Sequence, residues 1–252
     1  MSSKTPRSVS EPKPSVIKRS DVPAGKAYGE YREYLRHDFF HSCAYCTMSE
    51  VEAAAIGFAI DHYEPKRARP DIENDYSNLM YSCEECNTYK GDRYPPLDAR
   101  AAGNRFFRPD QDAYEDHFEL QGRLLRAKTP VGDYNIEAID LNRQTLRRVR
   151  EIRERFHECR KQVMAGILSL RGAHLDQLPQ HLKGRALRAI GNVETEATRI
   201  MEEIDDLLRE HAKSPLIDPD PEAEKRAEER ARRLRQKEAL FPGIWRARDV
   251  PK

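Results

Sequence analysis

Four of the five cysteines in this chain form two pairs with the same spacing: Cys43 and Cys46, and Cys83 and Cys86. Two residues separate the thiols of each pair, so one tight turn can present both to a single metal ion. Four thiolates suit tetrahedral Zn²⁺ and leave no open position for water, so the expected zinc is structural. The alternatives are four reduced, buried thiols, or a site in which His41 replaces one cysteine. We expect the fifth cysteine, Cys159, to be an ordinary helix residue.

The segment from the first pair to just beyond the second carries side chains suited to phosphodiester hydrolysis. That reaction needs a base for the attacking water and positive charge on the phosphate and the leaving oxygen. His62 is the candidate base because imidazole titrates near neutral pH, and the other seven histidines are expected to be ordinary. Asp61 and Asn87 offer oxygen atoms to Mg²⁺ or a similar ion. Lys66 and Lys90 are candidate phosphate contacts, or else ordinary surface lysines.

Short elements must hold these side chains. Apolar residues recur at helical spacing over 28–40, which predicts a helix leading into the first cysteine pair. Residues 58–63 place bulky apolar side chains at the alternate positions Phe58 and Ile60 and predict a strand, and a second short strand or loop is expected before Asn78. A helix is expected over 87–93, with Asn87 near its start and the proline pair at 95–96 ending it. The elements therefore predict two strands followed by one helix around the cysteines.

The order of these motifs is specific: Asp61-His62-x-x-Pro65-Lys66, then Asn78-Leu79, then Cys83-x-x-Cys86-Asn87-x-x-Lys90-Gly91. It resembles the ββα-metal finger of HNH endonucleases. The resemblance implies that His62 is the general base and that Asp61 and Asn87 hold Mg²⁺ or Mn²⁺. It also implies that Asn78 joins the two strands and orients the base through backbone hydrogen bonds. Neighbouring side chains on a flat strand point to opposite faces, so the family geometry requires local curvature after Asp61.

The second half of the chain is basic and helical. Residues 143–171 hold nine Lys or Arg and three Glu, and Arg147, Arg150 and Arg153 are candidate nucleic-acid contacts. A solvated amphipathic helix explains the same composition. Residues 138–150 are similar to the region that follows the finger in one HNH subfamily, which is found beside ATPases in bacterial anti-phage systems of the Septu and retron-associated kind. That resemblance implies a partner ATPase.

We therefore expect an α+β protein, with a small zinc-bound ββα-metal finger and a mainly α-helical C-terminal region. Its predicted parts are a disordered basic tail, the nuclease domain, a connector with a β-hairpin, a helical domain and a charged C-terminal helix with a tail: 1–27, 28–100, 101–134, 135–215 and 216–252. The region after 135 should serve recognition or assembly and hold no catalytic residue. The apolar cluster at 241–245 either folds back onto the helical core or docks to a partner.

Composition limits the function classes. The formal net charge is +1, so any contact with nucleic acid needs local basic patches rather than a uniformly basic chain. The sequence has no apolar signal region at its start and no apolar run of membrane-spanning length, so we expect a soluble cytoplasmic protein. In that reducing compartment, paired thiols indicate metal ligands rather than disulfides.

The combined prediction is a metal-dependent HNH endonuclease that cuts nucleic acid, DNA in preference to RNA. It would be the effector of a bacterial anti-phage defence system that includes an ATPase. Two other classes fit parts of the sequence: a non-catalytic zinc-binding module that recruits nucleic acid or protein, and a scaffold subunit whose long helices matter most. The presence of Asp61, His62 and Asn87 together favours the enzyme, because a binding module needs none of them.

Overall fold

The computed structural model describes residues 17–53, 56–171, 179–211 and 220–249. It divides the chain into two compact units, Met1–Arg143 with Glu222–Lys252, and Gln144–Pro221. The boundary predicted at residue 135 therefore differs from the structure, which places it after Arg143. The C-terminal helix, expected as a separate part, belongs to the first unit.

The first unit begins with the expected finger. A helical segment precedes the first cysteine pair and comprises η1 (Tyr28–Tyr31) and α1 (Arg32–Asp38), followed by the short α2 (Glu50–Ala53). Strands β1 (Phe58–His62) and β2 (Leu79–Cys83) are antiparallel, and the helix α3 (Glu84–Lys90) follows at once and packs against both. Every residue of β2 is buried, so this strand lies at the centre of the finger.

Two boundaries differ from the prediction. The second strand begins directly after Asn78 rather than before it, because η3 (Tyr76–Asn78) occupies the preceding turn. Helix α3 starts three residues earlier than expected, with Glu84 and Glu85 in its first turn, where the helix dipole favours acidic side chains. It ends at Gly91, whose φ of 55° suits glycine, before the proline pair is reached. Asn87 consequently lies in the middle of α3.

A second layer covers the finger helix. It contains α4 (Leu97–Ala101), α5 (Tyr114–His117), the hairpin β3 (Phe118–Gln121) and β4 (Leu124–Ala127), and α6 (Pro130–Ile139). The hairpin confirms the prediction of two strands around a glycine turn. Helix α6 starts with Thr129 capping the Gly132 amide and Pro130 in its first turn. It packs against α3 and β4 through buried side chains, which explains why the first unit extends past residue 135.

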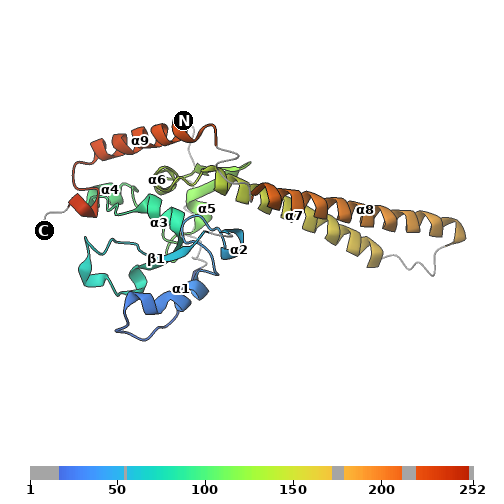
Figure 1. Ribbon diagram of the computed structural model, residues 1–252, viewed down its shortest axis with the longest axis horizontal. Helices are drawn as coiled ribbons and strands as arrows, with labels where there is room; N and C mark the ends of the chain where they lie inside the picture. The colour runs from blue at the N-terminus through green and yellow to red at the C-terminus, as the bar shows by residue number, and fades with distance from the viewer. Residues whose placement is uncertain (1–16, 54–55, 172–178, 212–219, 250–252) are drawn as a thin grey trace, which may run out of the picture. The chain divides into compact units, whose positions relative to one another are not determined.

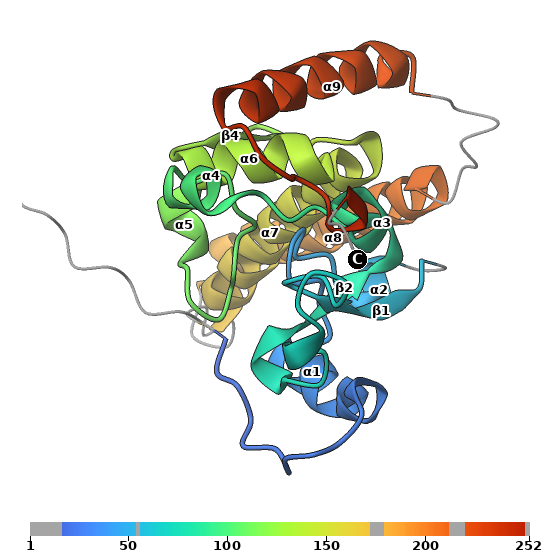
Figure 2. The same ribbon diagram turned by 90° about the vertical axis from the view of Figure 1, so that its left-hand side faces the viewer.

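Residues 136–149 do not form one continuous helix. Asp140 adopts a left-handed conformation and ends α6. Its carboxylate lies 3.2 Å from Arg230 and 3.5 Å from Arg226, both on α9 (Ala223–Leu240). Figure 2 shows α9 lying across α6, and Leu234 is buried on the inner side of that helix. The charged C-terminal helix is therefore paired along one side with its own chain.

The C-terminal segment folds back onto the finger. Residues 245–249, which we call the strap, run beside the segment that follows α3. The Tyr94 amide donates to the Trp245 carbonyl at 2.7 Å and the Ala247 amide donates to the Asp92 carbonyl at 2.8 Å. The Trp245 ring is buried with its centroid 6.3 Å from that of Tyr134 on α6. The two predicted alternatives were folding back onto the chain and docking to a partner. The structure shows the first, with the strap packed on the first unit.

The N-terminal segment also differs from the prediction. Residues 1–16 of the predicted disordered tail lie outside the described residues, but 17–27 are anchored. Arg19 donates to the Leu79 carbonyl at 2.7 Å and to the Asp110 carboxylate at 3.1 Å. Ser20 binds the buried Asp38 carboxylate through its amide at 2.7 Å and through its hydroxyl. These contacts supply partners for buried polar groups, so this part of the tail belongs to the folded finger.

The second unit consists of two long helices, α7 (Gln144–Arg171) and α8 (Gln180–His211), which pack side by side and agree with the expected helices (Figure 1). The predicted boundary between residues 215 and 216 lies outside the described residues. Among the described residues, no helix has the length and apolar character needed to span a membrane.

Candidate functional site

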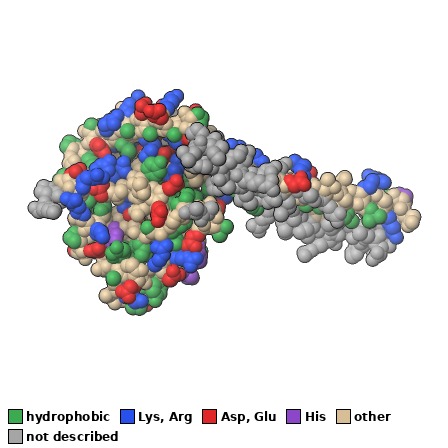
Figure 3. All heavy atoms as spheres, in the orientation of Figure 1, with side chains coloured by type: hydrophobic (Ala, Val, Ile, Leu, Met, Phe, Trp, Pro, Cys, Tyr) green, Lys and Arg blue, Asp and Glu red, His purple; other side chains and the backbone are tan. Residues whose placement is uncertain are grey.

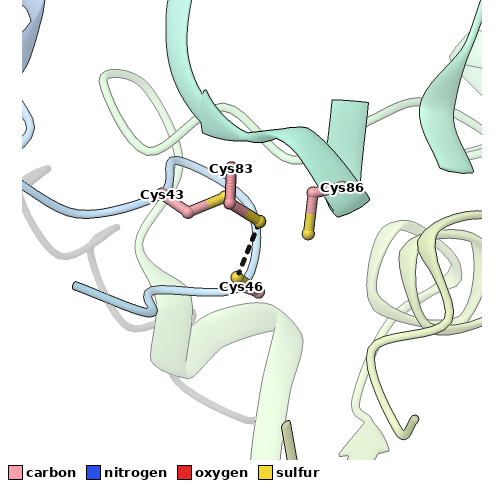
Figure 4. Close-up of side chains that lie close together, drawn as sticks. All are labelled: Cys43, Cys46, Cys83 and Cys86. Atoms are coloured by element: carbon pink, nitrogen blue, oxygen red, sulfur yellow. Dashed lines mark hydrogen bonds between the residues drawn. The ribbon is translucent and has the colours of Figure 1, made fainter. Parts of the chain in front are cut away.

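The four paired cysteines meet in one buried cluster. Cys43 and Cys46 come from the turn after α1, Cys83 ends β2, and Cys86 lies in the first turn of α3 (Figure 4). All four sulfur atoms lie within 4.8 Å of one another, and the Cys46 and Cys83 sulfurs are 3.8 Å apart. A tetrahedron with Zn–S distances of about 2.3 Å has sulfur–sulfur edges of about 3.8 Å. The cluster therefore fits Zn²⁺ in both donor type and spacing.

Backbone hydrogen bonds fix the first cysteine turn against β2. The Cys43 amide donates to the Met48 carbonyl at 2.9 Å, and the Ala44 amide donates to the Tyr81 carbonyl at 2.8 Å. Thr47, with a φ of 64°, closes the turn. His41 stays outside the cluster, half-exposed, with its Nδ1 atom 3.7 Å from the Glu50 carboxylate. The alternative in which His41 replaces a cysteine is therefore not what this structure shows.

Arg143 approaches the cluster from the segment after α6. Its guanidinium donates to the Cys86 sulfur at 3.5 Å and to the Glu85 carboxylate at 3.0 Å, and its side chain is only 5% exposed. Burial lowers the pKa of Arg143, but the nearby Cys86 and Cys46 thiols outweigh it and the pKa is raised overall. Burial and the neighbouring thiols raise the pKa of Cys86. The cluster thus favours added positive charge, which Arg143 and a bound metal ion both provide.

Asp61 is buried at the other end of the finger helix. Its Oδ2 atom accepts a hydrogen bond of 2.5 Å from the Tyr45 hydroxyl, and its Oδ1 atom lies 3.0 Å from the Lys90 ammonium. Lys90 also donates to the His62 carbonyl at 2.7 Å, and its side chain is 0% exposed. The expectation that Lys90 contacts phosphate from the surface does not fit this burial. Lys90 faces inward because α3 packs against β1, which puts the last residue of α3 against the Asp61 carboxylate.

His62 has a defined orientation beside Asp61. Its Nε2 atom lies 2.9 Å from the Glu73 carbonyl oxygen, and a carbonyl can only accept, so Nε2 carries the proton. The Nδ1 lone pair is then the acceptor of the neutral ring. Burial lowers the pKa of His62, which favours the neutral form of the ring. The ring also meets the edge of Tyr28, with centroids 4.9 Å apart.

Asn78, which directly precedes β2, is hydrogen-bonded to the segment that directly follows β1. Its side-chain oxygen accepts from the Glu64 amide at 2.9 Å, and its side-chain nitrogen donates to the Glu64 carbonyl at 3.1 Å. Its own backbone carbonyl accepts from the Tyr63 amide at 2.8 Å. The two residues after His62 are therefore held by one asparagine, which fixes the path of the chain as it leaves β1.

Comparison with known proteins agrees with this geometry. Residues 43–93 match the HNH endonuclease family model. The finger is an HNH domain. Septu protein PtuB of Bacillus thuringiensis is 24% identical over 102 residues, which is 40% of this chain and 37% of PtuB, so the match spans well under half of that relative. No solved structure matches the chain. The predicted fold class is confirmed, with an HNH domain, short strands and extensive helix.

Two predicted site residues of the HNH domain, Asn87 and Lys66, have side chains that are less buried than those of Asp61 and Lys90. Asn87 is half-buried on α3, and within the described part of the chain its side chain has no hydrogen-bond partner. Its side-chain oxygen and the Asp61 carboxylate are both hard donors, which fits Mg²⁺ or Mn²⁺. Lys66 is 55% exposed, with its ammonium 3.6 Å from Glu73 and 5.4 Å from the centre of the Tyr28 ring. Lys66 therefore stays a candidate phosphate contact.

The predicted arginine contacts lie outside the HNH domain, on α7. Arg147 is 3.2 Å from the Asp220 carboxylate within the second unit. Arg150 and Arg153 are half-buried and have interactions of their own. Cys159 also lies on α7, as expected. The predicted site residues thus fall into two groups, a catalytic and metal-binding group in the first unit and an arginine group in the second.

Three contacts in the first unit were not predicted from the sequence. Tyr45, which stands between the first two cysteines, holds Asp61, while Tyr28 packs on His62 and Arg143 covers Cys86. Only Tyr45 lies inside a recognisable motif, because it stands between Cys43 and Cys46. Tyr28 and Arg143 approach from other parts of the chain, and no local pattern identifies them.

Proposed function

We propose that this protein is a metal-dependent endonuclease that hydrolyses phosphodiester bonds of nucleic acid. The observation that carries the proposal is the orientation of His62 inside an HNH domain. Its Nε2 proton is bound to the Glu73 carbonyl, so its Nδ1 atom is available to accept a proton from water. A non-catalytic zinc module has no need of a neutral, oriented imidazole next to a buried carboxylate.

In this proposal each residue of the HNH domain has a distinct role. His62 takes the proton of the attacking water at Nδ1. Asp61 and Asn87 hold Mg²⁺ or Mn²⁺, which supplies positive charge to the phosphate and the leaving oxygen when bound. Asn78 fixes the chain after His62, so that the imidazole keeps its direction. The zinc of the cysteine cluster has no open position and stabilises the fold.

The substrate is proposed to be DNA in preference to RNA, held by local basic groups. On the face shown in Figure 3, Lys and Arg side chains are interspersed with Asp and Glu, in keeping with the net charge of +1. Lys66 is the exposed lysine closest in sequence to His62, and it would contact a phosphate near the cleaved bond. Arg147, Arg150 and Arg153 on α7 would contact the substrate backbone farther away or bind a partner protein.

The biological role is proposed to be antiviral defence in the bacterial cytoplasm. Its support is the similarity to a protein named Septu protein PtuB, together with the HNH domain. A partner ATPase belongs to the same proposal and rests on the subfamily resemblance of residues 138–150. Purification of the tagged chain from cells that carry its neighbouring genes, followed by mass spectrometry, tests for that partner.

The central experiment is a plasmid-nicking assay with Mg²⁺ or Mn²⁺. His62→Ala should lower the rate by about 10²–10⁴-fold, because a positioned general base contributes that much. Zinc content and the fold should stay intact, because His62 is not a zinc ligand. The matched control is His37→Ala, whose side chain is 84% exposed on α1. Cleavage by His62→Ala at the wild-type rate would exclude His62 as the base.

A second experiment addresses the arginines of α7. Reversing the charge at Arg147, Arg150 and Arg153 should weaken substrate binding and flatten its salt dependence, by roughly 0.9 in the logarithmic slope for each phosphate that is no longer neutralised. Reversal at Arg185 and Arg188, two exposed arginines of α8, serves as the control, with two charge reversals instead of three. If the α7 changes only lower the melting temperature, the arginines are structural.

A further inference from the structure

The Asp61 carboxylate is already occupied on both sides by groups of the chain. Tyr45 donates to its Oδ2 atom, and the Lys90 ammonium lies 3.0 Å from its Oδ1 atom. Asp61 is 5% exposed and Lys90 is 0% exposed, so the ion pair is closed to solvent. A divalent ion that binds Asp61 must therefore approach a carboxylate whose charge is neutralised by a buried lysine.

Lys90 also has partners that do not depend on Asp61. An ammonium has three donors, and one of them binds the His62 carbonyl at 2.7 Å. The ammonium also lies 5.4 Å from the centre of the Phe106 ring, close enough for a cation–π contact. Lys90 can consequently move away from Oδ1 and keep two other partners. Its position beside the His62 backbone does not require the salt bridge.

We propose that Lys90 and the catalytic divalent ion compete for the Oδ1 atom of Asp61, with Lys90 as the resident cation of the ion-free enzyme. This inference rests on the proposed function. A buried carboxylate without a counter-ion is strongly destabilising, and Lys90 supplies that counter-ion until the divalent ion arrives. Two cations on one oxygen repel each other in a site of low dielectric constant, so ion binding pushes the ammonium away from Oδ1. The enzyme would thus bind its ion weakly alone, and more tightly when the substrate phosphate adds negative charge.

The competition predicts an unusual effect of removing a positive charge. Lys90→Gln, which keeps a hydrogen-bond donor for Asp61, and Lys90→Met, which does not, should both bind Mn²⁺ more tightly than wild type. The expected gain is roughly 5–150-fold, the usual range for coupling between two ligands. Without Mn²⁺ both variants should melt at lower temperature than wild type. Saturating Mn²⁺ should restore their melting temperature more than it raises that of wild type.

The experiment measures Mn²⁺ binding by electron paramagnetic resonance on the full-length, zinc-loaded chain, with melting curves on the same samples. Lys128→Met, at an exposed lysine, is the control and should leave Mn²⁺ affinity unchanged. Asp61→Asn combined with Lys90→Gln should abolish the gain in affinity. If Lys90→Met does not fold, Lys90→Gln still decides the outcome, since it removes the charge and little volume.

Two results would overturn the competition. Mn²⁺ affinity in Lys90→Gln that equals or falls below that of wild type would show that Lys90 is not a competitor. A gain in affinity that persists in the double variant with Asp61→Asn would place the ion elsewhere. Either result leaves the nuclease proposal standing if wild type cleaves and His62→Ala does not. Failure of the nuclease proposal is recognised separately, by the absence of His62-dependent cleavage.

Discussion

The two ends of helix α3 take part in centres of opposite chemistry. At its start, Cys83 and Cys86 join two other thiols in a buried cluster of four soft ligands. At its end, Lys90 meets a single hard carboxylate, that of Asp61. One short helix thus separates a cluster of four soft ligands from the carboxylate to which we assign the exchange of metal, substrate and water.

A basic side chain is present at each end but does a different job. Arg143 donates to the Cys86 sulfur and adds to the positive charge that the thiolate cluster needs, so it works with a metal ion. Lys90 forms a buried ion pair with Asp61, one charge against one, and in our proposal it competes with a metal ion. If both proposals hold, burial and charge balance set how tightly each centre holds its metal, beyond the identity of the ligands.

The largest expected effect is at the thiol end. Cys83→Ser should abolish zinc binding and unfold the finger, because structural zinc contributes about 10–16 kcal/mol to folding in small zinc-binding peptides. Metal analysis should find about one zinc per chain in wild type and little in the variant. Near-ultraviolet circular dichroism reports the loss of packing around Tyr45 and Tyr81. Cys159→Ser, on α7, is the matched control and should retain zinc.

A folded, soluble wild-type chain that contains no zinc would refute the metal assignment directly. The two ends of α3 would then differ only as a cluster of reduced thiols and a carboxylate, with no metal at the thiol end.

The second effect separates two proposed ligands of the catalytic ion. Asp61→Ala and Asn87→Ala should both lower cleavage, with partial recovery at high Mn²⁺. Only Asp61→Ala should also destabilise the fold, by about 3–5 kcal/mol, because it leaves the buried Lys90 charge unpaired. Melting curves without divalent ion measure that difference. Equal melting temperatures for the two variants would contradict the buried ion pair.

The cysteine pairs and the Asp-His step could be predicted because short spacing encodes them. The hairpin and the strands likewise follow from local alternation and a glycine turn. The fate of Lys90 could not be predicted, since its partner Asp61 is 29 residues away and only the packing of α3 on β1 brings them together. Arg143 lies 57 residues from Cys86, and Asp92 lies 156 residues from Arg248. Local patterns carry no information on such contacts, so sequence alone left Lys90 as a candidate phosphate contact or a surface lysine, and left open whether the C-terminal cluster folds back or docks to a partner.

The third effect tests the contribution of Arg143 to metal retention. Arg143→Met preserves most of the buried volume but removes the donor to Cys86. Zinc affinity should fall by about 10–100-fold, the range found when a group that supports metal ligands is removed. The rate of zinc transfer to a chelating dye measures the change. Arg126→Met, on the exposed face of β4, is the control. An unchanged rate with a lower melting temperature would show that Arg143 contributes packing alone.

The smallest expected effect lies just beyond the carboxylate end, where the strap meets Asp92. The Asp92 carboxylate accepts hydrogen bonds from the Arg248 amide at 3.0 Å and from its guanidinium at 2.8 Å and 2.9 Å. The hydrogen bond from the Arg248 side chain lowers the pKa of Asp92 to about 2. Because the pair is exposed, Asp92→Asn should lower the melting temperature by no more than about 2–4 °C.

The pH dependence of this small effect follows from the sign of the pKa shift. The folded-state pKa of Asp92 lies below the usual value, so its stabilisation is fully present above that usual value and is lost only as pH falls toward 2. The difference between wild type and Asp92→Asn should therefore be constant from about pH 5 to about pH 8, since unpaired Asp titrates near 3.9. Concentrated salt should shrink it, because exposed charges are screened. Asp98→Asn, on the exposed side of α4, is the control. A difference that instead disappears as pH rises through neutrality would mean that a titrating group other than Asp92 holds the strap against the finger.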